Sequence, residues 1–162
     1  LKEMNKSQHK LIEYINQIQE ENPSSTVINS CTDITGFGLL GHLLEMLEPT
    51  NIYRLNINLE PIKIILDLDK LPVYNGVIRL IKEGHQSTLA PSNEIFLRKI
   101  NSDRKTEIEM NCNSKVSVAD YNAMLKILID PQTCGPLVVS CSSFYADKLI
   151  KNGPWKKIGF VS

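Results

Sequence analysis

The stretch Cys31–His42, with the sequence CTDITGFGLLGH, sets one carboxylate and two glycines directly before a strongly apolar segment. Asp33 in such a turn can hold a hard cation such as Mg²⁺, which prefers oxygen ligands. Gly36 and Gly38 let the backbone approach a ligand closely, and a helix that begins near Gly38 points its N-terminal partial positive charge at an anion. These residues predict metal-assisted phosphate chemistry.

Length and composition narrow the class of protein. The chain has 162 residues, the size of one domain that buries roughly two-thirds of its unfolded surface without disulfides or metals. Its 18 basic and 18 acidic residues leave no net positive charge to attract nucleic acid or an anionic membrane, so we expect neither partner. No apolar run approaches the roughly 20 residues that span a bilayer, and the polar start 1–6 is unlike a signal peptide.

The four cysteines show neither C-x-x-C spacing nor the density of a disulfide scaffold, and no histidine lies near them at zinc-ligand spacing. Reduced thiols in the cytoplasm fit this pattern best. Because the chain starts without Met and stops at Ser162, we expect it to be a fragment of a longer protein.

Helical and extended patterns alternate along the chain and predict one mixed α+β domain over residues 1–162. A stripe of aliphatic residues predicts a helix over 11–18, and a wide apolar arc predicts a central helix over 39–47. Ser117 and Asp120 resemble a capping box before another helix. We also expect helices near 77–81, 95–100 and 143–150, and strands near 26–28, 106–110, 137–141 and 155–161.

Three further segments have patterns of their own. Residues 53–60 alternate strictly between apolar and polar, which predicts a half-buried strand in an antiparallel or mixed sheet. Pro61 is expected to preorganise a helix start, followed by an irregular helical segment over 66–73. The polar segment 84–93 predicts a surface loop.

Two motifs resemble those of one known family. Thr32–His42 is similar to the T-D-V-T-G-F-G-L-L-G-H signature of the selenophosphate synthetases, also called selenide, water dikinases. Asp130–Gly135 is similar to the D-P-Q-T-S-G-G turn that follows later in that family. Softer matches are 84–93, with the family's G-x-x-S-x-x-x-P-x-N loop, and 158–161, with its closing I-G-x-V strand. The resemblance therefore covers most of the chain.

The resemblance implies a fold and a reaction. The fold is the C-terminal domain of the aminoimidazole ribonucleotide synthetase superfamily, a mixed or antiparallel sheet flanked by helices. In that family ATP lies between this domain and an N-terminal ATP-binding domain, and Mg²⁺ ions bridge its phosphates. Selenide, ATP and water are converted to selenophosphate, AMP and phosphate.

The resemblance also implies roles for individual residues. Asp33 matches the metal ligand of the C-terminal domain, and Thr35, Gly36, Phe37 and Gly38 would lie beside the nucleotide phosphates. The family's reactive Cys or selenocysteine and most of its metal carboxylates belong to the N-terminal half. This chain is therefore expected to hold no catalytic residue of its own, to be inactive alone, and to dimerise, if at all, through that other half.

Each residue also has a simpler interpretation. Asp33 could cap a helix through its carboxylate. Gly36 and Gly38 could merely fit a turn against neighbouring backbone. His42, within an apolar helix, is more typical of a packed and hydrogen-bonded imidazole than of a catalytic base.

The second motif departs from the family. Cys134–Pro136 stands where the family has Ser-Gly-Gly, and a proline removes one N–H and restricts φ, so that amide cannot contact an anion. Cys134 is expected to be structural rather than a reactive thiol. Gln132 and Thr133 could steady the turn or hydrogen-bond across a domain interface, and the sequence does not choose between these roles.

Three functions are compatible with these patterns. The favoured one is the C-terminal domain of a selenophosphate synthetase, which helps to bind Mg-ATP and needs its N-terminal domain for turnover. The second is a related ATP-dependent enzyme of the superfamily, such as aminoimidazole ribonucleotide synthetase or thiamine monophosphate kinase, and the complete Gly36–His42 run argues against it. The third is a non-catalytic scaffold that keeps the fold and has lost the chemistry, for which Pro136 and the expected absence of the N-terminal half argue.

Overall fold

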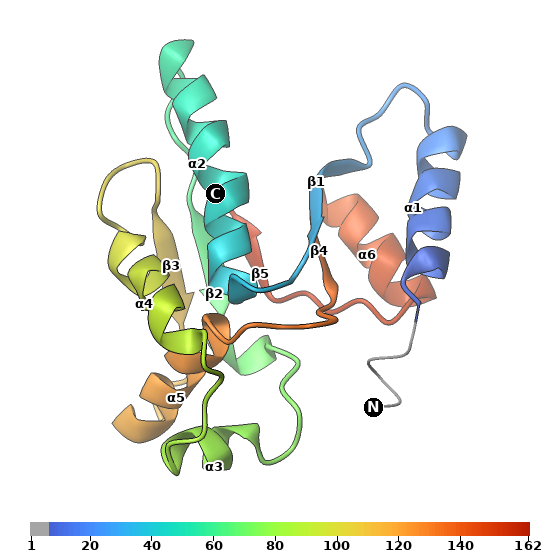
Figure 1. Cartoon of the computed structure of the whole chain (residues 1–162). Coiled ribbons are helices and arrows are strands. Elements are labelled where there is room, and N and C mark those ends of the chain that lie inside the picture. Colours follow the sequence, from blue (N-terminus) through green and yellow to red (C-terminus); the bar gives the residue numbers. More distant parts are fainter. Residues whose placement is uncertain (1–6) are drawn as a thin grey trace. The chain divides into compact units, whose positions relative to one another are not determined.

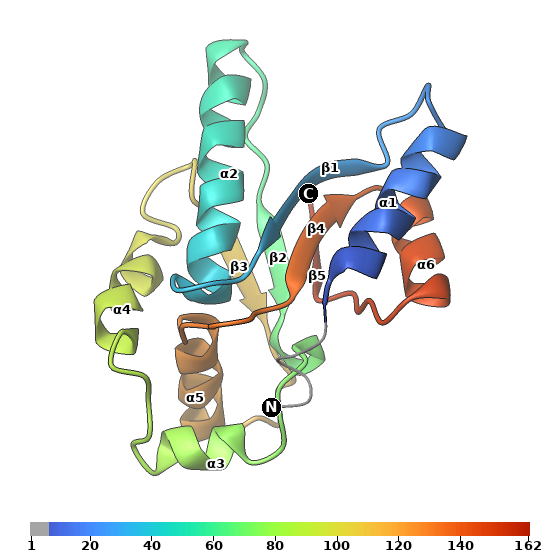
Figure 2. The same ribbon diagram turned by 45° about the vertical axis from the view of Figure 1, so that its right-hand side comes forward.

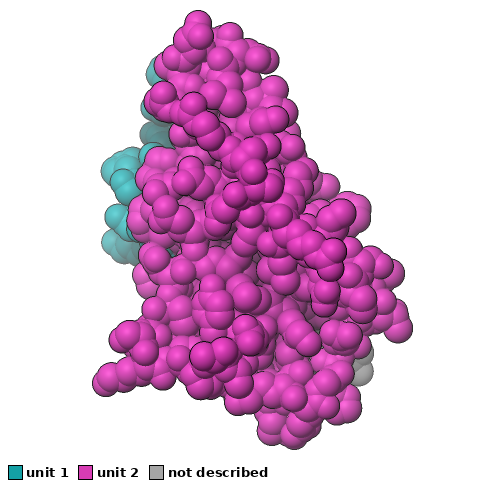
Figure 3. Space-filling view, turned by 90° about the vertical axis from the view of Figure 1, so that its left-hand side faces the viewer, with its two compact units in different colours: residues 1–34, 134–157 teal, residues 35–133, 158–162 magenta. Residues whose placement is uncertain are grey.

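The computed structural model describes residues 7–162, along which six α-helices, one 3-10 helix and five strands follow one another (Figure 1). The segment 1–6, whose polar sequence argued against a signal peptide, lies outside the described residues. The chain divides into two compact units, coloured separately in Figure 3. The first comprises residues up to Ile34 and Cys134–Lys157, and the second comprises Thr35–Thr133 and Ile158–Ser162. A compact unit need not fold alone, so a single domain stays a prediction.

The first unit packs two helices against a two-stranded antiparallel sheet. The helices are α1 (His9–Glu21) and α6 (Ser143–Asn152), which lie side by side in both ribbon views (Figures 1 and 2). The strands are β1 (Ile28–Asp33) and β4 (Leu137–Cys141). The predicted first helix is confirmed, and its aliphatic stripe contributes to this core. The buried core side chains are Ile15, Ile18, Val27, Tyr145 and Leu149.

The second unit is built on a three-stranded mixed sheet with the strand order β3-β2-β5. Strand β2 (Ile64–Asp67) runs parallel to β3 (Ile108–Asn111) and antiparallel to β5 (Gly159–Val161). Helix α2 contacts α4 and α5, and α3 contacts α5. Antiparallel and mixed sheets with flanking helices confirm the predicted α+β class. The helices of this unit are α2 (Gly38–Asn56), α3 (Val77–Lys82), α4 (Ala90–Lys99), α5 (Val118–Leu128) and the 3-10 helix η1 (Leu68–Lys70).

Helix α2 is the central helix that its wide apolar arc predicted. Most of its first three turns is buried, which requires neighbours on several sides. Even so, no helix within residues 7–162 has both the length and the apolar character needed to cross a membrane. The buried residues of α2 are Gly38, Leu40, Gly41, His42, Leu43, Leu44, Leu47 and Asn51.

The strand predicted over 53–60 was wrong, because α2 continues through Pro49 and ends at Asn56. Asn58 then adopts the left-handed conformation with φ 58°, which asparagine tolerates better than most residues. The N–H of Asn58 donates to Leu55 O (3.1 Å) and that of Leu59 to Arg54 O (2.8 Å), the paired bonds of a Schellman ending. The alternation therefore reflects a helix end and not a buried face: the side chain of Leu59 is 47% exposed.

The helix predicted over 66–73 was also wrong, because this segment contains the end of β2 followed by η1. Strand β2 is hydrogen-bonded on both sides, and its residues Ile65 and Leu66 are buried. A central strand buried on both faces has a continuous apolar sequence, which periodicity alone does not separate from a short helix.

The other predicted elements are present with shifted ends. Strand β1 begins at Ile28 and runs on to Asp33, and the last strand is shorter than predicted. Helix α4 begins at Ala90, so the end of the predicted loop 84–93 is helical. At the start of α5, Ser117 Oγ accepts a hydrogen bond of 3.1 Å from the Asp120 N–H, which confirms the cap.

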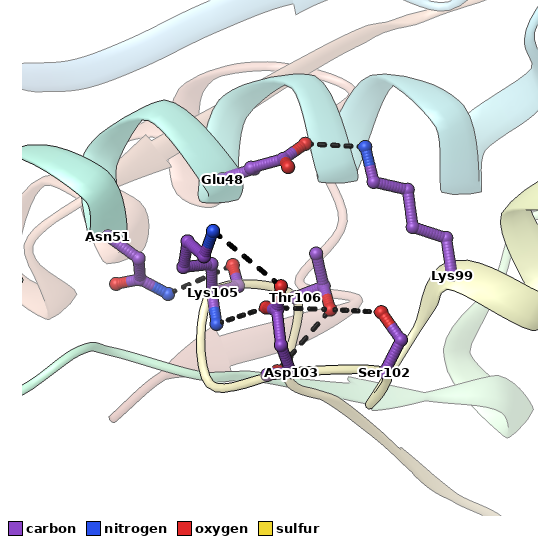
Figure 4. A network of polar contacts seen from close by, with 7 residues as sticks. All are labelled: Glu48, Asn51, Lys99, Ser102, Asp103, Lys105 and Thr106. Carbon is purple, nitrogen blue, oxygen red and sulfur yellow. Dashed lines mark hydrogen bonds and ion pairs between the residues drawn. The ribbon is translucent and has the colours of Figure 1, made fainter.

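A buried amide, Asn51, joins α2 to two other segments of its unit, and Figure 4 shows its contact with Lys105. Asn51 is completely buried. Its Nδ2 donates to the carbonyl oxygens of Ile62 (2.7 Å) and Lys105 (3.2 Å), and its Oδ1 accepts from the Ile62 N–H (2.7 Å). One helix turn earlier, Glu48 pairs with Lys99 at 2.6 Å. Asn51 thus pairs with backbone groups of two half-buried residues, Ile62 and Lys105.

We expect Asn51→Leu to lower the free energy of unfolding by about 2–4 kcal/mol, because each buried polar group left unpaired costs about 1–3 kcal/mol. Denaturant unfolding of the 162-residue chain measures this loss. Asn56→Leu, at the exposed last position of the same helix, is the matched control and should change stability by no more than about 0.5 kcal/mol. Equal losses in the two variants would contradict a structural role for the buried amide.

Candidate functional site

Asp33 is the last residue of β1, where it lies opposite Leu137 of β4 in the first unit. Its side chain is exposed and forms no hydrogen bond or ion pair with another described residue. The N-cap of α2 is Phe37, without a side-chain hydrogen bond, so the alternative of Asp33 as a helix cap is not what the structure contains. An open carboxylate with no protein partner is compatible with binding a cation from solution.

The charge of Asp33 is felt by its neighbour on the strand. Cys31 lies two residues earlier, on the same face of β1. Burial, and then the negative charge of Asp33, raise the pKa of the Cys31 thiol above its ordinary value. A raised pKa disfavours the reactive thiolate at this position.

The turn Thr35–Gly38 opens the second unit, and its carbonyl oxygens are tied back into the protein. Thr35 O accepts hydrogen bonds from Gly38 N (3.1 Å) and from Gln132 N (3.0 Å). By contrast, no described residue accepts a hydrogen bond from the N–H groups of Gly36 and Phe37, and both residues are exposed. The turn therefore presents donors, and not acceptors, to an anion.

Different structural constraints apply to Gly36 and Gly38, the two glycines of this turn. Gly38 has φ +67°, and a Cβ there would lie 2.8 Å from the backbone of Leu128 and Ile129. Gly36 has no atom within 4 Å of an added Cβ. Packing against the end of α5 thus explains Gly38, whereas at Gly36 the structure leaves open space in front of the backbone.

Asn93 of α4 is a site residue that sequence reasoning missed. It is only 6% exposed, and its Nδ2 donates to Gly36 O (2.8 Å) and to Ile129 O (3.0 Å). The amide therefore ties the turn to the end of α5. The available signal was the family's loop pattern over 84–93, which ends on this asparagine without indicating what it contacts.

The second motif meets the first through Gln132. Its backbone N–H binds Thr35 O, and its Nε2 donates to Asp130 O (3.2 Å) and Asp130 Oδ2 (3.1 Å). Burial raises the pKa of Asp130, against the lowering effect of hydrogen bonds from Gln132 and the Ser87 backbone. Gln132 steadies the turn, while Thr133 is exposed.

The variant triplet Cys134–Pro136 belongs to the first unit and pairs with the end of β1. Pro136 O accepts a hydrogen bond of 3.0 Å from Ile34 N, so this position uses its carbonyl and not the amide that proline lacks. A Cβ on Gly135 would lie 2.0 Å from Ile34 O. Cys134 is a free, exposed thiol.

His42 is buried, as the packed-imidazole interpretation predicted. Its Nε2 lies 3.1 Å from Thr35 N, and its Nδ1 lies 2.9 Å from Glu45 Oε2. Within residues 7–162, no three His, Cys, Asp or Glu side chains cluster closely enough to hold a metal ion. A cation at Asp33 would therefore need most of its ligands from a phosphate, water or another domain.

Comparisons with known proteins identify a matching family and similar sequences. The family model described as "AIR synthase related protein, C-terminal domain" matches residues 3–151. Proteins named "Selenide, water dikinase" are similar to the chain. That of Clostridioides difficile (strain 630) is 32% identical over 77% of this chain and 29% of its own length. The Caldanaerobacter subterraneus subsp. tengcongensis protein is 28% identical over 87% of this chain and 34% of its own length. The Geobacter metallireducens protein is 34% identical over 75% of this chain and 29% of its own length. The chain spans about a third of the length of these curated relatives.

We expect Gly38→Ala to destabilise the chain by about 2–4 kcal/mol, because a left-handed non-glycine residue costs about 1–2 kcal/mol and overpacking adds about 1–3 kcal/mol. Gly36→Ala is the control within the same turn and should change stability by no more than about 0.5 kcal/mol. Thermal and denaturant unfolding of both variants measure the difference. If Gly36→Ala proved as costly as Gly38→Ala, the contrast between the two positions would be wrong.

Proposed function

The chain belongs to the family of AIR synthase related proteins, as their C-terminal domain, and from this premise we propose that it is the C-terminal domain of a selenide, water dikinase. In this role it helps to bind Mg-ATP for the conversion of selenide, ATP and water to selenophosphate, AMP and phosphate. The complete enzyme is a phosphotransferase, and this chain contributes binding residues to it.

The observation that carries the proposal is the convergence of two distant sequence segments on one turn. Gln132 binds the carbonyl of Thr35 and Asn93 binds that of Gly36, while the N–H groups of Gly36 and Phe37 have no acceptor among the described residues. Successive outward N–H groups form a concavity that suits phosphate oxygens. Segments far apart in sequence are thus used to hold a short anion-binding backbone.

Asp33 supports the metal part of the proposal. Its exposed carboxylate offers the hard oxygen donor that Mg²⁺ prefers, and it has no competing protein partner among the described residues. One carboxylate suffices from this side, because Mg²⁺ takes about six oxygens and usually only one or two of them from carboxylates. Mg²⁺ would supply neutralisation of the phosphate charge that develops during transfer.

The chain's own residues would position and stabilise rather than react. Phosphoryl transfer depends mostly on alignment and on charge neutralisation, which backbone N–H groups and a bound cation provide. We propose that the nucleophile, the remaining metal carboxylates and any homodimer contact belong to an N-terminal domain of the longer protein, and that ATP and selenide are its substrates. The four free cysteines suit the reducing cytoplasm, which we propose as the location.

The other functions considered receive less support. The relatives compared above carry the name of the selenium enzyme, not that of aminoimidazole ribonucleotide synthetase or thiamine monophosphate kinase. Pro136 was one of the two features that favoured a non-catalytic scaffold, the other being the expected absence of the N-terminal half. Since the Pro136 carbonyl pairs with Ile34 N, this proline is compatible with an ordered turn and does not favour loss of function.

We expect Asp33→Asn in the full-length protein to lower selenide-dependent AMP formation by about 10²-fold or more, because the charged ligand proposed to hold Mg²⁺ beside the phosphates is lost. The free energy of unfolding should change by less than about 0.5 kcal/mol, since the side chain is exposed. Asp147→Asn, on the exposed face of α6, is the matched control and should leave activity unchanged. A large loss of stability with normal activity would show that Asp33 is structural.

We also expect the isolated 162-residue chain to release no AMP from ATP, with or without selenide. One carboxylate and one turn of backbone provide only part of a two-sided site. Chromatographic detection of AMP with Mg²⁺ present checks this, and a full-length protein assayed in parallel is the positive control. Steady AMP release from the pure chain would overturn the division of labour proposed above.

A further inference from the structure

His42 connects two charged or polar groups of the second unit through a buried ring. The side chain is 8% exposed and lies in the first two turns of α2. Its Nε2 is 3.1 Å from Thr35 N and 3.0 Å from Thr35 Oγ1, and its Nδ1 is 2.9 Å from Glu45 Oε2. Phe37 covers the ring, with 5.8 Å between the ring centroids.

The hydrogen-bond partners assign the tautomer of this imidazole. A backbone N–H can only donate, so the Nε2 that faces Thr35 N must accept. The ring proton then lies on Nδ1, where the Glu45 carboxylate accepts it. Glu45 is exposed and therefore holds the ring from the solvent side, one turn further along the same helix.

From this geometry we propose that His42, held in one tautomer by Glu45, is a positioning residue for the phosphate-binding turn. It orients the amide and the hydroxyl of Thr35, while Gln132 and Asn93 hold the carbonyl oxygens of Thr35 and Gly36. The inference rests on the proposed function, because it assigns a purpose to the turn that binds phosphate. It adds a residue that acts through Thr35 and does not touch the substrate.

The same geometry argues against His42 as a general base. The single lone pair of Nε2 is engaged by Thr35, and Nδ1 is engaged by Glu45. No ring nitrogen is left to take a proton from a substrate. Removing the ring should therefore disorder the turn and not abolish a proton-transfer step.

The test uses two variants of different reach. In His42→Gln, the Oε1 atom lies about where Nε2 was and can still accept from Thr35 N. In His42→Asn, the shorter amide reaches only to about the position of Nδ1. Hydrogen exchange of the Thr35 amide, measured by NMR on the 162-residue chain, reads out the bond directly and needs no substrate.

We expect Thr35 amide exchange to stay slow in His42→Gln and to accelerate about tenfold in His42→Asn, which corresponds to about 1.4 kcal/mol, as for one lost hydrogen bond. Glu45→Ala should give an intermediate acceleration, because the ring loses the carboxylate that orients it while its Nε2 can still accept from Thr35 N. His9→Asn is the matched control, since His9 pairs with Glu13 on an exposed helix face and should not affect Thr35.

The full-length protein provides the second readout. We expect His42→Asn to raise the KM for ATP at least tenfold while His42→Gln stays within about threefold of the parent. If Thr35 exchange is unchanged in His42→Asn, or if His42→Gln loses kcat as completely as His42→Asn while keeping slow exchange, the positioning role is wrong. If exchange follows the expected order but the full-length protein forms no AMP from selenide and ATP, the proposed function fails and the positioning of Thr35 stands.

Discussion

The close contact between Gly38 and the end of α5 is the constraint on which the turn Thr35–Gly38 depends. Gly38 is both the first residue of α2 and left-handed, and the backbone of Leu128 and Ile129 occupies the space of a side chain there. This contact sets where α2 begins and brings Gln132, just beyond α5, within hydrogen-bond reach of Thr35. The absence of a Cβ at Gly38 therefore satisfies both the packing against α5 and the geometry of the turn.

Around that contact, the carbonyl oxygens of the turn and its N–H groups differ in whether they have hydrogen-bond partners. The carbonyl oxygens of Thr35 and Gly36 accept hydrogen bonds from other residues, whereas the N–H groups of the exposed Gly36 and Phe37 have no acceptor among the described residues. An anion is attracted by N–H dipoles and repelled by carbonyl dipoles, so this division supports the proposal that the turn binds an anion. The buried groups that enforce this division, Asn93 and His42, lie on two different helices.

Much of the fold could be predicted from local patterns, and the failures have clear physical causes. The aliphatic stripe of α1, the apolar arc of α2 and the cap at Ser117 were sufficient to predict three helices. The burial pattern and the ends of a helix are encoded within a few neighbouring residues. The strand predicted over 53–60 was wrong because the helix end at Asn58 carries an alternating apolar and polar sequence. The helix predicted over 66–73 was wrong because β2 lies between two other strands and has no polar face that would mark it as a strand. For the proposed site, Asp33 and the turn were predicted from one continuous motif, and their binding roles stay predictions. The contact of Asn93 with Gly36 spans 57 positions and exists only after α4 has packed, so no local pattern predicts it.

The pairing of Gly135 and Pro136 with Ile34 has a consequence for how relatives of this chain are recognised. At the first of these two positions the carbonyl of Ile34 leaves no room for any side chain, whereas the second contributes only its own carbonyl to the strand. A diagnostic pattern for this turn should thus insist on glycine once and leave the following position unrestricted. A search that demands two successive glycines would discard sequences, this one among them, whose backbone still closes the turn.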